Sequence, residues 1–236
     1  METIGDGVRA YILLSGGIDS STCMAIANES YNGDIEGVSF NYGQRHQNEL
    51  EHAKKVCEHY DVKHHIIDVQ GLFGKGGLTD ASLTMPTVDY ADLPEGVSPT
   101  YVPFRNGAML SLLTSYASQY EMAEAIYFGA HADDAANWAY PDCTPEFIGG
   151  MANAIYIGTY HKIRLYTPLM FMDKTQIIQL GTELKTPYQY TWSCYQGESI
   201  HCGVCPTCRS RRVGFLNADV VDPTVYAKDI HWSELP

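Results

Sequence analysis

The chain has few basic residues and no long hydrophobic run. Its 15 Lys and Arg face 28 Asp and Glu, so the formal net charge is −13 over 236 residues. A protein that binds a polynucleotide neutralises phosphates with Lys and Arg, so this balance favours a small-molecule substrate and predicts no nucleic-acid partner. No apolar segment approaches the roughly 18 residues of a membrane span, and residues 1–6 do not resemble a signal peptide. We therefore expect a cytoplasmic protein with no membrane partner.

The sequence also lacks the Walker loop G-x-x-x-x-G-K-[ST]. It has instead the segment SGGIDSS at residues 15–21, between an apolar run at 11–14 and a helix-compatible stretch at 22–27. A strand, a glycine turn and a helix N-terminus together form a backbone cradle for an anion. The glycines let backbone amides approach an oxyanion closely, and the serines add hydroxyl donors. The segment therefore predicts a nucleotide phosphate site.

Apolar runs alternate with helical patterns along the chain. Predicted strands cover residues 9–14, 35–42, 64–69, 125–130 and 163–166, and predicted helices cover 20–30, 45–60, 105–120, 146–157 and 173–184. This alternation predicts an α/β fold, a Rossmann-like parallel five-stranded sheet with helices on both faces, whose ligands bind beyond the carboxyl ends of the strands. The long connection at 70–103 is rich in Gly and Pro, which predicts a substrate or lid loop.

Four of the seven cysteines gather near the C-terminus, at Cys194, Cys202, Cys205 and Cys208. Two C-x-x-C steps that share a cysteine can bring four thiolates onto one ion, so a structural Zn²⁺ site is our first interpretation. An iron–sulfur cluster is the second interpretation and a redox pair the third. His201 is expected to be a neighbour of the site. The remaining cysteines, Cys23, Cys57 and Cys143, are expected in the core.

Asp133 and Asp134 follow the fourth predicted strand, where a carboxylate could hold Mg²⁺ or contact a ligand. The basic groups that could meet phosphate are few. They are Arg45, Arg105, Lys174, Arg209, Arg211 and Arg212.

The phosphate segment resembles the pyrophosphate-binding loop of the ATP pyrophosphatase family. Several segments then resemble, in order, the 7-cyano-7-deazaguanine synthase family of queuosine precursor biosynthesis. They are SGGIDSSTC at 15–23, NYGQRH at 41–46, GLTD at 77–80, YVPxRN at 101–106, YPDC at 140–143, PEF at 145–147, TPL at 167–169, DK at 173–174 and TWSCY at 191–195, followed by the cysteine cluster. The resemblance runs from about residue 10 to residue 216.

The resemblance implies a zinc-containing homodimer that uses ATP and ammonia to convert 7-carboxy-7-deazaguanine into the nitrile through adenylated intermediates. It implies a nucleotide-binding domain over 1–190 and a zinc-binding lobe over 191–236. The expected ATP-binding residues are Leu14, Ser15, Gly16, Gly17, Ile18, Asp19, Ser20, Ser21 and Thr22, with Asp19, Ser20, Arg105 and Lys174 in catalysis. The expected substrate-binding residues are Tyr42, Gln44, Arg45, Asn106, Asp133 and Asp142.

Three positions depart from the pattern of that family. Phe104 and Ala139 stand where the family usually has Gly, and Thr144 stands where it usually has Arg; the loop at 134–138 is also longer. A missing arginine near a substrate carboxylate could redirect substrate choice. An amide-forming deazapurine ligase, a tRNA-modifying enzyme with the same loop and an ATP-binding sensor therefore stay open as alternatives.

Overall fold

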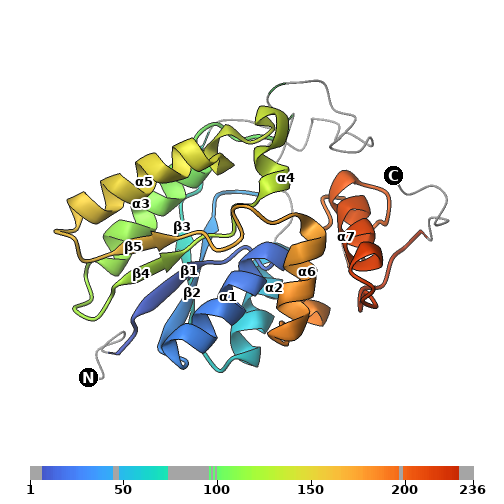
Figure 1. The fold of residues 1–236 in the computed structure, drawn as a ribbon, viewed down its shortest axis with the longest axis horizontal. Coiled ribbons are helices and arrows are strands. Elements are labelled where there is room, and N and C mark those ends of the chain that lie inside the picture. The colour runs from blue at the N-terminus through green and yellow to red at the C-terminus, as the bar shows by residue number, and fades with distance from the viewer. Residues whose placement is uncertain are drawn as a thin grey trace.

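The computed structural model describes residues 7–44, 48–73, 96, 98, 100–196 and 199–228. Its centre is one sheet of five parallel strands in the order β3-β2-β1-β4-β5 (Figure 1). The strands are β1 (Ala10–Leu13), β2 (Ile35–Asn41), β3 (His64–Asp68), β4 (Ala125–Tyr127) and β5 (Arg164–Tyr166). All five strands agree with the sequence-based prediction.

Seven α-helices surround the sheet in the described part of the chain. They are α1 (Ile18–Tyr31), α2 (Asn48–His59), α3 (Arg105–Ala117), α4 (Ala132–Ala135), α5 (Pro145–Gly158), α6 (Lys174–Glu183) and α7 (Pro206–Asn217), with short 3₁₀ turns at Ala136–Trp138, Pro141–Cys143 and Tyr188–Tyr190. The predicted α/β fold with a parallel five-stranded sheet is confirmed. Helices α4 and α7 were not predicted.

Alternation along β1 divides the core into two layers. Ala10 and Ile12 pack with α1, α2 and α6, whereas Tyr11 and Leu13 pack with α3 and α5 on the opposite face. Successive side chains of a strand point to opposite faces, so a four-residue apolar strand can supply both layers. The expected covering of both faces by helices is therefore present, as Figure 1 shows.

The order in which strands are added to the sheet reverses at β1. Strand β2 pairs with one edge of β1 and β4 with the other edge, so β1 is the switch point of the topology. Ligands of open α/β sheets bind beyond the carboxyl ends of the strands at such a point. The phosphate segment follows β1 directly and is placed there.

The C-terminal segment forms a third, smaller cluster around Trp192, Cys194, Cys205 and Cys208. Its helix α7 lies beside α6 (Figure 1). The division of the chain at residue 191 into two domains stays a prediction. Across the described residues, no helix has both the length and the apolar character needed to cross a membrane.

Candidate active site

Backbone geometry makes the phosphate loop dependent on glycine. Gly16 has φ +77°, and a Cβ there would come within 2.6 Å of the Ala53 nitrogen and of the Glu49 carbonyl oxygen. A side chain at this position would therefore meet both a strained conformation and the backbone of α2. The Gly16 carbonyl accepts a 2.8 Å hydrogen bond from the backbone N–H of Trp192. The loop is thus fixed between α2 and the C-terminal segment.

Two serines of the loop hold each other in place. The Ser20 hydroxyl accepts a 3.2 Å hydrogen bond from the Ser15 backbone N–H and lies 3.1 Å from the Ser15 hydroxyl. Gly17, the N-cap of α1, has extended backbone and no side-chain cap, so the first amides of α1 receive no capping acceptor from it. Uncapped amides at a helix N-terminus are donors for an anion.

Ser21 and Thr22 differ from the other residues predicted to bind ATP. Both are fully buried. The Thr22 hydroxyl donates to the Ile18 carbonyl and lies 3.0 Å from the Tyr188 hydroxyl. Neither residue lines a cavity beside the loop, and the contact with Tyr188 makes Thr22 a residue that positions α1.

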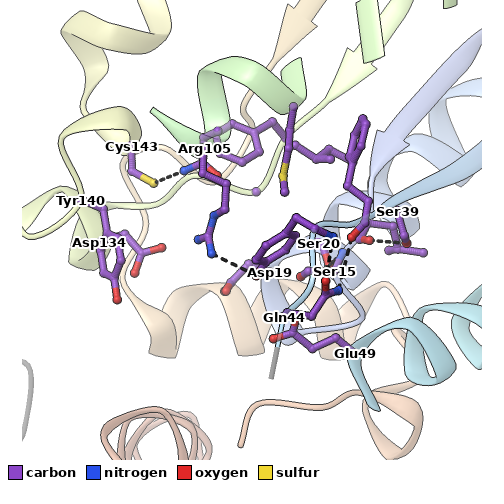
Figure 2. A pocket seen from close by; sticks show the side chains of 18 of the residues that line it. Ser15, Asp19, Ser20, Ser39, Gln44, Glu49, Arg105, Asp134, Tyr140 and Cys143 are labelled. Carbon is purple, nitrogen blue, oxygen red and sulfur yellow. Dashed lines mark hydrogen bonds between the residues drawn. The ribbon is translucent and has the colours of Figure 1, made fainter. Parts of the chain in front are cut away.

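Two adjoining cavities open beside the loop. The larger, of about 210 Å³, lies above the ends of β1 and β2, and Figure 2 shows its lining side chains. The smaller, of about 160 Å³, lies between the loop and the C-terminal segment. The two cavities share Ser15, Asp19, Glu49, Asp134 and Tyr195, which mark their junction. Leu14 and Ser20 line only the larger cavity, and Gly17 and Ile18 only the smaller.

Asp19 is held by two basic groups. The Lys174 ammonium lies 2.5 Å from one carboxylate oxygen, and His131 Nε2 lies 3.7 Å from the other. Burial alone would raise the pKa of Asp19, but Lys174 and His131 together lower it below the usual value. Asp19 is therefore ionised at neutral pH, and Lys174, at the first position of α6, brings a positive charge to the phosphate loop.

Arg105 reaches the larger cavity from the start of α3. Its guanidinium donates a 3.1 Å hydrogen bond to the Tyr42 hydroxyl and lies 5.4 Å from the centre of that ring (Figure 2). Burial raises the pKa of Tyr42 to about 12 although Arg105 opposes the shift. Tyr42 is therefore a neutral hydrogen-bonding group that orients a permanent cation toward the cavity.

Gln44 lines the same cavity but uses its amide locally. It accepts from the Tyr42 backbone N–H at 2.9 Å and donates to the Phe40 carbonyl at 3.3 Å. It thereby shapes the turn that follows β2. Arg45, predicted to bind substrate, lies outside the described residues.

Asn106 and Asp142 are paired with each other. The Asp142 carboxylate accepts from the Asn106 backbone N–H at 2.9 Å and from its side-chain amide at 3.1 Å. Asp142 is 2% exposed and does not line either cavity, whereas Asn106 and Cys143 line the larger one. Asp142 therefore fixes the start of α3. Its carboxylate, which we predicted to bind substrate, is used by Asn106 and lies behind the cavity wall.

Asp133 and Asp134 have separate positions. Asp133 lines the smaller cavity and accepts a 3.0 Å hydrogen bond from the Lys174 backbone N–H, so it caps α6. Asp134 lines both cavities and lies 3.3 Å from His131 Nε2. The sequence suggested both residues as possible ligand or Mg²⁺ contacts and placed only Asp133 among the expected substrate-binding residues, but Asp134 is the one that lines both cavities.

The three departures from the family pattern have local explanations. Phe104 has φ 58°, the left-handed conformation that favours glycine, and its ring packs edge-on against Phe147. Thr144 caps α5 by accepting from the Phe147 backbone N–H at 3.3 Å. Ala139 closes a turn with Ala136. Phe104 thus takes up the left-handed backbone at its position with its ring packed on Phe147, and Thr144 serves as the N-cap of α5.

The C-terminal segment forms the far wall of the smaller cavity. It contributes Trp192, Ser193, Tyr195, Thr207, Ser210 and Arg211. The Arg211 guanidinium is engaged with the Asp222 carboxylate at 3.1 Å, the Thr191 hydroxyl at 2.7 Å and the Tyr188 carbonyl at 3.2 Å. Its charge is therefore largely committed to structure. Sequence reasoning named Arg211 as a group that could meet phosphate but missed the rest of this wall, because no local pattern shows that residues around 192 and 210 lie beside residues 15–19.

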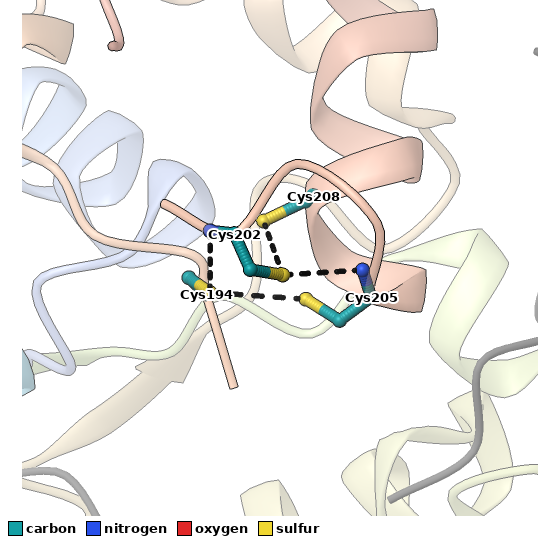
Figure 3. A group of neighbouring side chains, drawn as sticks. All are labelled: Cys194, Cys202, Cys205 and Cys208. Carbon is teal, nitrogen blue, oxygen red and sulfur yellow. Dashed lines mark hydrogen bonds between the residues drawn. The ribbon is translucent and has the colours of Figure 1, made fainter. Parts of the chain in front are cut away.

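The four cysteines predicted to bind metal converge in space (Figure 3). The sulfur atoms of Cys194, Cys202, Cys205 and Cys208 all lie within 4.8 Å of one another. Backbone N–H groups of Val204 and Cys205 donate to Cys202 Sγ at 3.4 and 3.3 Å, and the N–H of Cys202 donates to Cys194 Sγ at 3.2 Å. Such donors stabilise thiolates, so the donor set fits a metal ion.

His201 stays outside this set of sulfur ligands. Its Nε2 accepts a 3.0 Å hydrogen bond from the Ser193 backbone N–H, and its ring lies 4.3 Å from that of Trp192. The expectation that it neighbours the metal site agrees with this geometry.

The fold and the loop define a nucleotide-binding α/β protein of the ATP pyrophosphatase type. The family described as "Queuosine biosynthesis protein QueC" matches residues 9–219. A 7-cyano-7-deazaguanine synthase of Thermoplasma volcanium is 39% identical over 226 residues, which cover 93% of this chain and 91% of the relative. One from Ralstonia nicotianae is 43% identical over 227 residues, which cover 92% and 98%. The chain therefore belongs to the QueC family.

A solved structure supports the fold. The U34-tRNA thiolase NcsA from Methanococcus maripaludis superposes with a TM-score of 0.50 and 15% identity, covering 92% of this chain and 74% of that one. That protein was solved with its [4Fe-4S] cluster. At this identity the likeness concerns the fold alone, so it does not decide which metal the four cysteines bind.

Proposed function

We propose that this chain is an ATP-dependent ligase that converts 7-carboxy-7-deazaguanine and ammonia into 7-cyano-7-deazaguanine. The single observation that carries the proposal is the pair of adjoining cavities at a phosphate loop, in a chain that matches the QueC family over residues 9–219. The smaller cavity suits the nucleotide phosphates, and the larger cavity suits the planar deazapurine substrate, beside Tyr42 and Arg105. The name of the relatives, 7-cyano-7-deazaguanine synthase, supplies the product, and the substrate is the carboxylate from which that nitrile would be made.

The chemistry requires the carboxylate to be activated twice. The substrate carboxylate attacks the α-phosphate of ATP, pyrophosphate leaves and an acyl-adenylate forms. Ammonia then displaces AMP to give an amide. The amide oxygen attacks a second ATP, and loss of AMP with the remaining N–H protons gives the nitrile. Both activations build negative charge on departing pyrophosphate, which donors placed beforehand stabilise best.

The residues of the loop and α6 match this demand. Gly17 and Ile18, at the start of α1, line the smaller cavity, and Lys174 brings a positive charge to it. In this proposal Ser15, Gly17 and Ser20 bind the departing pyrophosphate, and Lys174 neutralises its charge. Arg105 faces the larger cavity, where it would hold the substrate carboxylate next to the α-phosphate.

Two metal ions belong to the proposal. The four-sulfur site suits Zn²⁺, and because sulfur fills all four tetrahedral positions the ion would hold the C-terminal segment without taking part in chemistry. Oxygen ligands suit Mg²⁺, which would be held by Asp19 with Asp134 or Asp133 and would neutralise phosphate charge. The family resemblance adds that the protein is a homodimer in the cytoplasm. Size-exclusion chromatography with light scattering tests the dimer.

Nucleotide analysis tests the reaction class. Purified protein is incubated with ATP, Mg²⁺ and ammonium, with and without 7-carboxy-7-deazaguanine. We expect AMP and pyrophosphate to be released only with the carboxylate present, one of each for every activation. Release of ADP and inorganic phosphate would show that attack occurs at the γ-phosphate and would contradict the proposal.

A further inference from the structure

We propose that Glu49 is the proton acceptor that converts ammonium into the nucleophile attacking the acyl-adenylate. This inference rests on the proposed function and adds a catalytic residue to it. Glu49 is the second residue of α2 and lines both cavities. Figure 2 shows it among the side chains of the larger cavity. A group at this junction can contact a molecule that approaches the bond between the acyl carbon and the adenylate.

Three carboxylates stand at the junction of the cavities, and they differ in their partners. Asp19 is paired with Lys174 at 2.5 Å, and Asp134 lies 3.3 Å from His131 Nε2. Among the residues that the structure describes, no hydrogen bond or ion pair is made to the Glu49 carboxylate. Glu49 thus differs from Asp19 and Asp134, each of which has a basic partner in the described part of the chain.

The surroundings of Glu49 set its proton affinity. Charged and titratable groups line the same two cavities: Asp19 at the start of α1, Tyr42 after β2, Arg105 from α3, Asp134 from α4, Lys174 from α6 and Tyr195 from the C-terminal segment. Of these, Arg105 and Tyr42 interact electrostatically with Glu49. Burial raises the pKa of Glu49 to about 7, and the Arg105 charge opposes the shift. A general base acts best when its pKa lies near the working pH.

The proton balance of the amide-forming step requires such a base. Ammonium has no free electron pair, so one N–H bond must break before nitrogen can attack. Glu49 takes this proton first, the freed electron pair of ammonia then forms the N–C bond, and a second nitrogen proton passes to water as the C–O bond to AMP breaks. AMP leaves with the electron pair of that bond.

The Glu49→Gln variant tests this role by separating activation from amide formation. Exchange of labelled pyrophosphate into ATP, dependent on 7-carboxy-7-deazaguanine, reports adenylation alone. We expect Glu49→Gln to keep this exchange within about twofold and to slow ammonia-dependent amide formation on the order of a hundredfold, within the range for losing a general base. Hydroxylamine, which is already neutral at pH 7, should restore product formation in the variant.

The matched control is Glu51→Gln, an exposed carboxylate in the same turn of α2. It should behave like the wild type in both assays. At a fixed total ammonium concentration, the wild-type rate of amide formation should bend downward below about pH 7, whereas the Glu49→Gln rate should follow the fraction of free ammonia with no bend near pH 7. Loss of pyrophosphate exchange in Glu49→Gln, or an unchanged ammonia-dependent rate, would overturn the role. Absence of exchange in the wild type would instead contradict the proposed function.

Discussion

The Lys174 ammonium lies 2.5 Å from Asp19 Oδ1 and joins the first position of α6 to the phosphate loop after β1. These two residues are separated by 155 positions in the sequence. The pair brings a cation to the place where pyrophosphate would depart, and it keeps the Asp19 carboxylate ionised for a metal–nucleotide complex. The catalytic centre thus depends on how α6 packs beside α1.

Replacing Asp19 by Asn should reduce turnover by at least about a hundredfold, the range seen when one preorganised electrostatic group is removed. Ser20→Ala should act in the same direction, because its hydroxyl accepts from the Ser15 backbone N–H and shapes the loop. Steady-state AMP release measures both effects, and circular dichroism checks the fold. Ser30→Ala, at the exposed end of the same helix, is the control and should keep wild-type turnover.

Packing between α6 and the Tyr188 turn predicts a contrast between two helical glycines. A Cβ on Gly181 would collide with the Tyr188 hydroxyl, which also contacts Thr22 beneath the phosphate loop. Gly181→Ala should therefore lower the free energy of unfolding by about 1–3 kcal/mol through overpacking. Gly149, in α5, has open space around it, so Gly149→Ala should stabilise the protein by up to about 1 kcal/mol. Equal effects in urea denaturation would argue against this packing.

Burial of His64 predicts a dependence of stability on pH. Burial lowers the pKa of His64 from 6.5 to about 4, and its Nε2 lies 2.7 Å from the Ser39 hydroxyl. Below pH 6.5 the unfolded chain binds a proton that the folded chain refuses, so this contribution to stability is lost as the pH falls toward 4. His64→Asn should weaken the dependence of the melting temperature on pH between pH 4 and pH 6.5, whereas replacing the exposed His59 by Asn should leave that dependence unchanged.

Loss of one cysteine ligand should weaken metal binding and also disturb the smaller cavity beside the phosphate loop. Cys205→Ser should lower zinc content and melting temperature, because metal binding supplies folding free energy. It should also raise the KM for ATP, since the Trp192 N–H that fixes Gly16 belongs to the segment leading into the cysteine cluster. Cys143→Ser should keep the zinc. Elemental analysis that finds iron at stoichiometry in the wild type would contradict the zinc assignment.

The strands and the phosphate loop were predictable because their signals are local. Four apolar residues at 10–13 and the glycine turn after them carry the information in consecutive positions. Helix α7 was missed because Arg211 and Arg212 are among its buried residues, beside Cys208 and Phe215, and such a mixture has no apolar period. Arg211 can be buried because its charge is met by Asp222, the Thr191 hydroxyl and the Tyr188 carbonyl, which are distant in the sequence.

The residues of the candidate site also divide into those with a local sequence signal and those that only the fold brings into place. Asp19, Ser20 and the cysteines stand in short motifs, so the sequence predicted their grouping. Asp142 stands in a motif too, but its carboxylate is used by Asn106, a pairing that only the packing of α3 against the turn at 141–143 creates. Glu49 resembles any charged residue of an amphipathic helix until the fold places it at the junction of two cavities.

The central claim is that this chain makes a nitrile from a carboxylate by two activations with ATP. Mass spectrometry of the product formed from 7-carboxy-7-deazaguanine, ATP and ¹⁵N-ammonium tests it most directly. We predict 7-cyano-7-deazaguanine with one ¹⁵N atom, preceded in single-turnover samples by the labelled amide. A product that stays at the amide under excess ATP, or unchanged substrate with no AMP released, would contradict the account.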